Sequence, residues 1–427
     1  MLFRSNLWNL GPPAVPTASL AWDMNPASST AFPNSGVQLV GQCNAAFTAN
    51  YNNGGNLNTY EAAAPACGTG VPDYFDVNRN LSNPKYVEWN FEVEHTLGSR
   101  AILSANYVGN RGYDELYRNP FLNAFGFGSL PATAPDPRVA QVVQLTDGAV
   151  SNYNGLTLSF QEKSWHGLSG RINYTYSHAL DDVSNGGALG FSIYNSLIFQ
   201  TDPYSIRNSY ASADYDSRHT LTASYLYQLP FKSGNRLLNA AIGGWQISGT
   251  LFAHTGFPFT IVDGAEAGAL VPNNVISSTL GGPSIILQPE FSRRDFNDVR
   301  GCLSPLAPCF GIDGGVNSTA PYLFAPSTNF TNSVVGRNAF RGPGYLGGDM
   351  SLRKNFKVTE RVDLELGLNA YNFLNHTNFA NPLASTAFGQ SFGTVIFTQY
   401  TPTSPYGAFA QAATDMRIAA LMGKVTF

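Results

Sequence analysis

The chain has 427 residues and a formal net charge of −4, and only 12% of its residues are charged. Soluble domains carry about 25% charged residues, so this charge content is unusually low for a soluble protein. Nucleic-acid-binding proteins favour a basic face, so we expect no nucleic-acid partner. No stretch approaches the ~20 successive apolar residues of a membrane-spanning helix, which excludes a helical membrane protein.

Aromatic residues are abundant instead, with 29 Phe and 21 Tyr, while the mean hydropathy is near neutral. The apolar residues are therefore diluted among small polar ones. A membrane β-barrel has such a composition because only every second residue of a strand touches lipid. Composition leaves open the alternative of a soluble all-β protein, such as a propeller or a sandwich.

Residues 1–85 show little periodicity and many turn formers, as in the Asn-Asn-Gly-Gly run at 52–55. We expect mostly irregular loop here, with one or two strands, ahead of a barrel portion over residues 86–427. Residues 1–6 lack the basic start and the apolar core of a signal peptide. Because an exported protein needs such a signal, we expect the chain to be a fragment.

From Trp89 onward apolar and polar residues alternate, with Trp89, Phe91 and Val93 on one face and Glu92 and Glu94 on the other. A period of two is the signature of a β-strand. Short turns between alternating runs predict antiparallel hairpins. The same alternation recurs at 101–107, 156–161, 168–176, 220–229, 245–254 and 362–369.

The expected connections alternate in length. Short ones (98–100, 164–167, 231–235, 357–361) join paired strands, and long ones (about 110–150, 179–215 and 255–345) intervene. Bacterial outer-membrane barrels have short periplasmic turns and long extracellular loops, whereas a propeller would repeat every ~40–50 residues. The pattern predicts an all-β, antiparallel transmembrane β-barrel.

The charged residues of the polar face are candidates for lining a water-filled lumen. Barrel strands that face lipid on one side present the opposite side to the interior. The candidate lumen-lining residues are Glu92, Glu94, Arg171, Asp363 and Glu365.

The cysteines Cys43, Cys67, Cys302 and Cys309 lie in loop-like stretches rich in Gly, Pro, Ala and Asn. Neither neighbouring pair has the short spacing of a zinc site. In an oxidising compartment each pair could close a loop disulfide, and free thiols in loops are the alternative.

The last residues read as a strand that ends on an aromatic residue. Counting back by two from Phe427 gives Val425, Gly423 and Leu421 on one face. A final strand ending on Phe resembles the outer-membrane assembly signal, for which Leu421, Val425 and Phe427 are the candidate residues.

Ordered motifs then indicate a family. The chain resembles the C-terminal barrel portion of TonB-dependent receptors of the Oar-like type, whose members carry a carboxypeptidase-regulatory-like domain. The segments that carry the resemblance occur in the family's order over residues 83–427: 83–112, 151–156, 174–182, 214–219 with 244–246, 336–344 and 372–379.

The resemblance implies a receptor or transporter barrel in the outer membrane of a Gram-negative bacterium. Full receptor barrels have 22 strands. At ~9–11 residues per strand we expect roughly 10–14 strands in this chain, and no plug domain or TonB box is recognisable. The implied partners are outer-membrane lipid, the barrel assembly machinery and the TonB complex, acting through a plug that this chain lacks. We expect a monomer that binds no cofactor or metal.

Three motifs contain residue types that could carry chemistry. Asp181-Asp182 could form a paired-carboxylate site but reads better as the start of a loop after a strand. His219, after Asp216 and Arg218, reads as part of a local ion pair at the barrel rim, because no strained nucleophile elbow accompanies it. His376 could ligate a metal, but Asn-rich turn chemistry explains it better. No catalytic residue is expected.

Two alternative functions stay open at this point. One is a surface or adhesive outer-membrane barrel that uses its loops without active transport. The other is a soluble secreted β protein.

Overall fold

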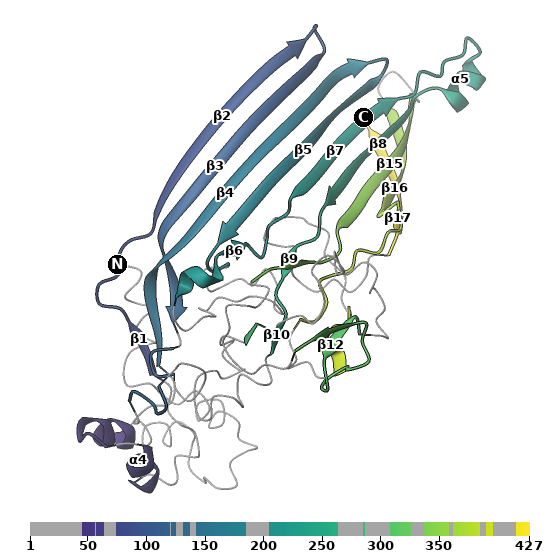
Figure 1. The fold of residues 1–427 in the computed structure, drawn as a ribbon. Coiled ribbons are helices and arrows are strands. Elements are labelled where there is room, and N and C mark those ends of the chain that lie inside the picture. The colour runs from purple at the N-terminus through teal and green to yellow at the C-terminus, as the bar shows by residue number, and fades with distance from the viewer. Residues whose placement is uncertain are drawn as a thin grey trace.

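The computed structural model describes residues 45–55, 57–63, 74–119, 121–124, 131–136, 142–184, 205–263, 285–286, 308–325, 337–357, 362–384, 390–395 and 416–427. Its main element is an 11-stranded sheet, whose strand order along the main path is β17-β16-β15-β8-β7-β5-β4-β3-β2. Figure 1 shows these strands side by side. Within the described residues nine strands lie on this path, just below the roughly 10–14 that the sequence predicts, and the other two strands of the sheet are short and attached beside it.

Nine strands form the main path, and each pairs antiparallel with its neighbours. Along the chain, successive strands of this path are spatial neighbours, so the sheet is an up-and-down meander. The strands are β2 (Lys85–Leu97), β3 (Ala101–Asn119), β4 (Val142–Trp165), β5 (Leu168–Asp181), β7 (His219–Gln228), β8 (Trp245–His254), β15 (Tyr345–Lys357), β16 (Asp363–Tyr371) and β17 (Ile418–Thr426).

The remaining elements are short. β1 (Tyr74–Val77) pairs parallel with β4, and β6 (Ala211–Ser212) pairs with β5. The others are α4 (Leu57–Ala63), the 3-10 helix η4 (Ile206–Ser209), α5 (Arg236–Ile242), β9 (Pro258–Phe259), β10 (Val262–Asp263), β11 (Ile285–Ile286), β12 (Phe310–Ile312), β13 (Tyr322–Phe324) and β14 (Phe340–Arg341). No described helix has both the length and the apolar character needed to cross a membrane.

The strand ends that flank the short turns lie at one end of the sheet together with the C-terminus, and the strand ends that flank the long connections lie at the other end (Figure 1). The tightest turn is His166-Gly167, where both residues have positive φ (50° and 88°). Two residues of positive φ match the right-handed twist of a two-residue hairpin. The predicted alternation of short and long connections is therefore present.

Two connections differ from the expectation. The turn expected at 231–235 is longer, because α5 lies between β7 and β8 and begins at the N-cap Asn235, whose side chain accepts hydrogen bonds from the N–H groups of Leu237 and Leu238. The loop expected at 110–150 is shorter, because β3 runs on to Asn119 and β4 starts at Val142. β-Bulges after Gly112 and Glu115 break the alternation there and hide the strand from the sequence pattern.

Beyond the sheet, the long connections form a small apolar core of their own. Phe310 lies at its centre, with ring centroids 5.0 Å from Phe392, 5.9 Å from Phe324 and 6.3 Å from Phe259. Phe340, on β14, is also buried in it. Aromatic pairs at such separations stabilise a core beyond the area they bury, so these loop segments pack as an ordered layer at the loop end.

The predicted division of the chain into an irregular region (1–85) and a barrel portion (86–427) stays a prediction. In the first part the structure describes α4 and β1, and β2 begins at Lys85.

Candidate functional site

The sheet register sorts the side chains of nine strands onto two faces. One register row joins Val93, Ala105, Leu158, Tyr174, Leu221, Ala253 and Leu346 from β2 to β15. Its neighbour on the opposite face joins Glu92, Asn106, Thr157, Thr175, Thr220, His254 and Tyr345. We call the face that carries the first row the apolar face and the face that carries the second row the polar face.

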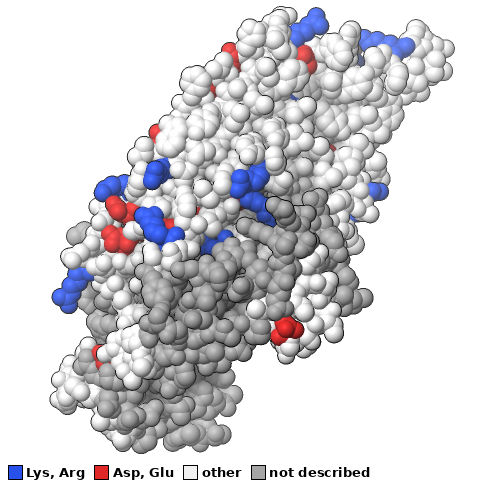
Figure 2. All heavy atoms as spheres, in the orientation of Figure 1, with Lys and Arg blue, Asp and Glu red and all other residues white. Residues whose placement is uncertain are grey.

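Large side chains of the apolar face are exposed. Leu158 is 44% exposed and Phe91 is 67% exposed. Figure 2 shows a sheet surface whose middle is nearly free of charge, with Lys, Arg, Asp and Glu gathered toward its two ends. A contiguous exposed apolar surface of this extent requires an apolar environment. Other exposed members are Val93, Leu103, Leu156, Phe160, Ile172, Leu366, Leu368, Leu421 and Val425.

The polar face is held by hydrogen bonds between side chains of neighbouring strands. Thr157 and Thr175 lie 2.9 Å apart between their hydroxyl oxygens, and Ser159 donates to Asn173 at 2.8 Å. Asn173 donates in turn to Thr222 at 3.0 Å. This ladder orders the face across β4, β5 and β7, and leaves it lined by small hydroxyl and amide groups.

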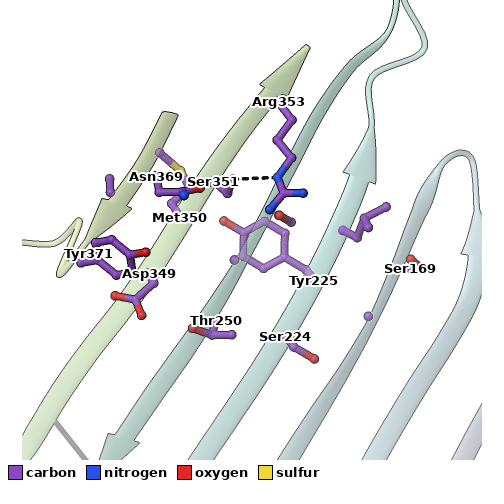
Figure 3. A pocket seen from close by; sticks show the side chains of 15 residues that line it. Ser169, Ser224, Tyr225, Thr250, Asp349, Met350, Ser351, Arg353, Asn369 and Tyr371 are labelled. Carbon is purple, nitrogen blue, oxygen red and sulfur yellow. Dashed lines mark hydrogen bonds between the residues drawn. The ribbon is translucent and has the colours of Figure 1, made fainter. Parts of the chain in front are cut away.

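A hollow of about 560 Å³ lies on the polar face between β5 and β16. Figure 3 shows Ser169, Ser224, Thr250 and Arg353 around it, from four neighbouring strands. Arg353 donates to Ser351 at 3.2 Å and forms an ion pair with Glu365 at 3.1 Å. The hollow has the hydroxyl-rich, sparsely charged lining that suits a wet path rather than a catalytic centre.

The loop end of the sheet carries a second polar site, which we call the rim cluster. Four Asp (Asp181, Asp182, Asp214, Asp216) pair with four Arg (Arg207, Arg218, Arg337, Arg341). The numbers of opposite charges balance. Buried charges persist in proteins when they are paired and hydrogen-bonded in this way.

Arg337 is the centre of the rim cluster and its side chain is fully buried. It forms ion pairs with Asp181 and Asp214, and donates to the carbonyl of Ser209 at 2.9 Å and to the hydroxyl of Ser184 at 3.2 Å. Its guanidinium therefore ties the end of β5 to two loop segments that are distant in sequence.

Asp216 forms the second half of the rim cluster. It pairs with Arg218 at 2.8 Å and also with Arg341, and it accepts a hydrogen bond from the backbone N–H of Ala179 at 2.8 Å. Arg218 also lies 2.6 Å from Nε2 of His178. The expected local ion pair before His219 is present, and Arg341 extends it to β14.

Burial governs the acidity of two loop carboxyls in this cluster. Removal from water raises the pKa of Asp182 to about 6, against the lowering effect of a backbone hydrogen bond from Val150 and of the Arg207 charge. Burial likewise raises the pKa of Asp214 to about 6, although Arg337 and the Asn338 amide oppose the shift. Desolvation outweighs pairing at both positions.

The sequence-predicted polar residues all lie on the polar face but do not converge on one site. Glu92 faces Asn106 and Glu94 faces Ser104 on β3, and Arg171 donates to Asn173 at 2.9 Å. Asp363 lies opposite Thr426, and Glu365 pairs with Arg353. Whether these residues line a lumen stays a prediction.

Of the predicted assembly residues, Val425 and Phe427 lie at the short-turn end, and Leu421 lies in the middle of β17, opposite Leu368. Leu421 is 89% exposed, Phe427 is 94% exposed, and Val425 is paired opposite Leu364 on the apolar face. Their role as an assembly signal stays a prediction.

The structure describes one of the four cysteines for which loop disulfides are predicted. Cys309 is buried in the loop core and disulfide-bonded, while Cys43, Cys67 and Cys302 lie outside the described residues. The pairing stays a prediction.

Asp181, the last residue of β5, lies in the rim cluster, and His376 lies in an Asn-rich turn where Nδ1 is 3.1 Å from Oδ1 of Asn378. Within the described ranges no group of three or more His, Cys, Asp or Glu could hold a metal ion.

The sequence did not predict that Arg337 and Arg341 pair with the aspartates of the rim cluster, although both lie in the motif segment 336–344.

Comparison with known proteins points to a family. A family model described as "Outer membrane beta barrel domain" matches residues 14–404. No curated protein matches the sequence.

Solved structures that resemble the chain are larger. One is the outer membrane transporter YddB from Escherichia coli, with 11% identity and a TM-score of 0.40, covering 84% of this chain and 34% of that one. A second is FpvA of P. aeruginosa bound to heterologous pyoverdines, with 10% identity, a TM-score of 0.35 and coverage of 79% and 27%. A third is the ferric enterobactin receptor PfeA of Pseudomonas aeruginosa, with 12% identity, a TM-score of 0.33 and coverage of 80% and 31%. The chain spans about a third of the length of YddB.

Proposed function

The chain belongs to the outer membrane beta barrel domain family, and from this premise we propose that it is a barrel segment of a TonB-dependent receptor that binds or takes up a ligand. The family locates the chain in the outer membrane of a Gram-negative bacterium and confirms the predicted fold class. The alternative of a soluble secreted protein is thereby wrong.

The observation that carries the proposal is the two-faced register. Nine strands present one apolar and one polar surface from β2 to β17, with the register shifted at the loop end of β3 and beside the turn between β4 and β5. In a receptor the apolar face contacts lipid and the polar face lines the interior, where a ligand passes. Glu92, Glu94, Arg171, Asp363 and Glu365 then line this path, and the hollow beside Arg353 is part of it.

The Oar-like subtype is the finer part of the proposal. Three motif segments of that resemblance, at 174–182, 214–219 and 336–344, supply charged residues of the rim cluster. Because these segments contact one another through buried ion pairs, each depends on the others, and we expect the three motifs to occur together in one type of barrel. This shared location supports the subtype over an unrelated barrel.

The proposed partners follow from the surfaces. Lipid covers the apolar face, the barrel assembly machinery recognises Leu421, Val425 and Phe427, and the TonB complex acts through the plug that such receptors carry. The receptor works as a monomer. The barrel transfers no chemical group in this scheme, so it has neither a catalytic residue nor a cofactor.

The test is expression of the full-length gene product in a Gram-negative host with and without a functional TonB complex. A receptor fractionates with the outer membrane, changes its gel mobility on heating, and supports ligand uptake only when TonB is present. Outer-membrane location without any TonB-dependent uptake would favour the adhesive barrel instead.

A further inference from the structure

A second hollow of about 560 Å³ lies at the loop end of the polar face, between β2, β3, β4 and β5. We call it the rim pocket; its lining includes Tyr86, Glu115, Ser151, Tyr153 and Asp181. Its volume is in the range of small-molecule sites. It is distinct from the hollow around Arg353, with which it shares no lining residue.

A β-bulge places Glu115 in this pocket. The register of β3 against β4 shifts between Gly112 and Glu115, and Asp114 has a φ of 54°. Glu115 therefore pairs with Ala149 and lies on the polar face, whereas an unbroken register would turn it to the apolar face. A bulge that redirects one side chain is a recurrent feature of binding sites.

The surroundings are shaped to hold the Glu115 carboxylate. Ser151 donates to it at 2.8 Å, and the Tyr86 hydroxyl lies close to it. A Cβ at Gly112 would overlap this carboxylate, so the glycine leaves the space that the Glu115 side chain occupies over the strand. The carboxylate is thus fixed at the pocket wall.

Glu115 also lacks a positive partner. It forms no ion pair with any residue that the structure describes, and the described lining of the rim pocket contains no Lys, Arg or His. Asp181, the other lining carboxylate, is already paired with Arg337. A partly buried carboxylate without a counter-ion is unfavourable and is relieved by a cation.

We propose that the rim pocket binds an organic cation through an amine or guanidinium group, with Glu115 as the counter-ion and Tyr86 and Tyr153 as aromatic walls. Tyrosine faces attract such groups through their π-electrons. The inference names the ligand class of the proposed receptor and rests on that proposal. Neutral saccharides and anionic chelates lack the positive charge that Glu115 would pair with.

The experiment measures binding of spermidine and of arginine amide to the full chain in detergent micelles by calorimetry, with maltotriose and citrate as neutral and anionic probes. We expect both cations to bind and neither of the others to do so. Glu115→Gln preserves the size of the side chain and removes the charge, and it should weaken binding of the cations roughly tenfold.

Two further variants separate charge from structure. Tyr86→Leu should weaken binding roughly threefold, because it removes one aromatic wall. Glu162→Gln, which removes a carboxylate at the short-turn end of β4, should bind like the unaltered chain. Equal binding by the Glu115→Gln and Glu162→Gln variants would overturn the inference, as would preferential binding of maltotriose or citrate.

Heat-dependent gel mobility, recorded on the same samples, keeps this test separate from that of the proposed function. A heat-modifiable, lipid-inserting protein that ignores both cations refutes the ligand class and leaves the barrel intact. A protein that never inserts refutes the receptor, and the inference falls with it.

Discussion

Arg337 and Asp181 are 156 residues apart in the sequence, yet their side chains form an ion pair in which they are 0% and 3% exposed. The pair joins the loop between β13 and β14 to the end of β5. The same guanidinium reaches Asp214, ahead of β7. One residue therefore fixes three chain segments at the rim.

Replacement of Arg337 by alanine should release these segments. Removing one partner of a buried pair leaves an uncompensated charge and costs about 3–5 kcal/mol. We expect limited proteolysis to cleave the rim segments of the Arg337→Ala variant while the sheet keeps its heat-modifiable mobility. Arg171→Ala, on the open polar face, is the matched control, and equal protease resistance of both variants would contradict the role of the rim cluster.

The rim should also loosen as pH rises from about 4 to about 6. Asp182 and Asp214 have a pKa of about 6 in the folded chain, above the ordinary value of 3.8. The folded state then binds more protons than the unfolded state in this interval, so the free energy of unfolding falls as pH rises and levels off above the folded pKa.

Asp214→Asn tests this pH dependence, because it imitates the protonated carboxyl and should flatten the profile. The measurement is the rate of rim proteolysis, with an acid-tolerant protease calibrated on an unstructured substrate at each pH. A variant profile as steep as that of the unaltered chain would assign the effect to other groups.

A charge on the apolar face should hinder membrane insertion. An arginine at the bilayer midplane of a barrel costs about 2–4 kcal/mol. We expect Leu158→Arg to lower the yield of refolding into lipid vesicles, whereas Thr157→Arg, one residue away on the polar face, should refold normally. The reverse order of yields would invert the assignment of the faces.

Loss of the terminal aromatic residue should impair assembly in cells more than refolding in vitro. Phe427 is 94% exposed and makes little contribution to the packed structure, so Phe427→Ala should refold in detergent. In cells the same variant should accumulate less in the outer membrane than Thr426→Ala. Equal outer-membrane levels of the two would remove Phe427 from the assembly signal.

The regular part of the fold was predictable, because alternate residues of a strand point to opposite faces of the sheet and produce an apolar–polar alternation in the sequence. Trp89 to Leu97 follow it except at His95, Leu156 to Gln161 follow it throughout, and the register confirms their faces. The end of β3 was not predictable, because the bulges at Gly112 and Glu115 change the phase of the pattern.

The two sites at the loop end were visible only in part. The sequence singled out Asp181, Asp216 and Arg218 but could not pair Asp181 with Arg337, since a contact across 156 residues leaves no local signal. Glu115 carried no signal at all, because its position depends on one extra residue in the strand. Long-range ion pairs and bulges are set by tertiary packing.

The central claim is that the apolar face contacts hydrocarbon and the polar face contacts water. Nitroxide spin labels placed in turn at residues 156–161 of the vesicle-reconstituted chain test it directly, through collision with dissolved oxygen and with a water-soluble nickel complex. We predict that oxygen accessibility peaks at Leu156, Leu158 and Phe160 and that nickel accessibility peaks at the residues between them. Uniform accessibility, or peaks in the opposite phase, would contradict the account.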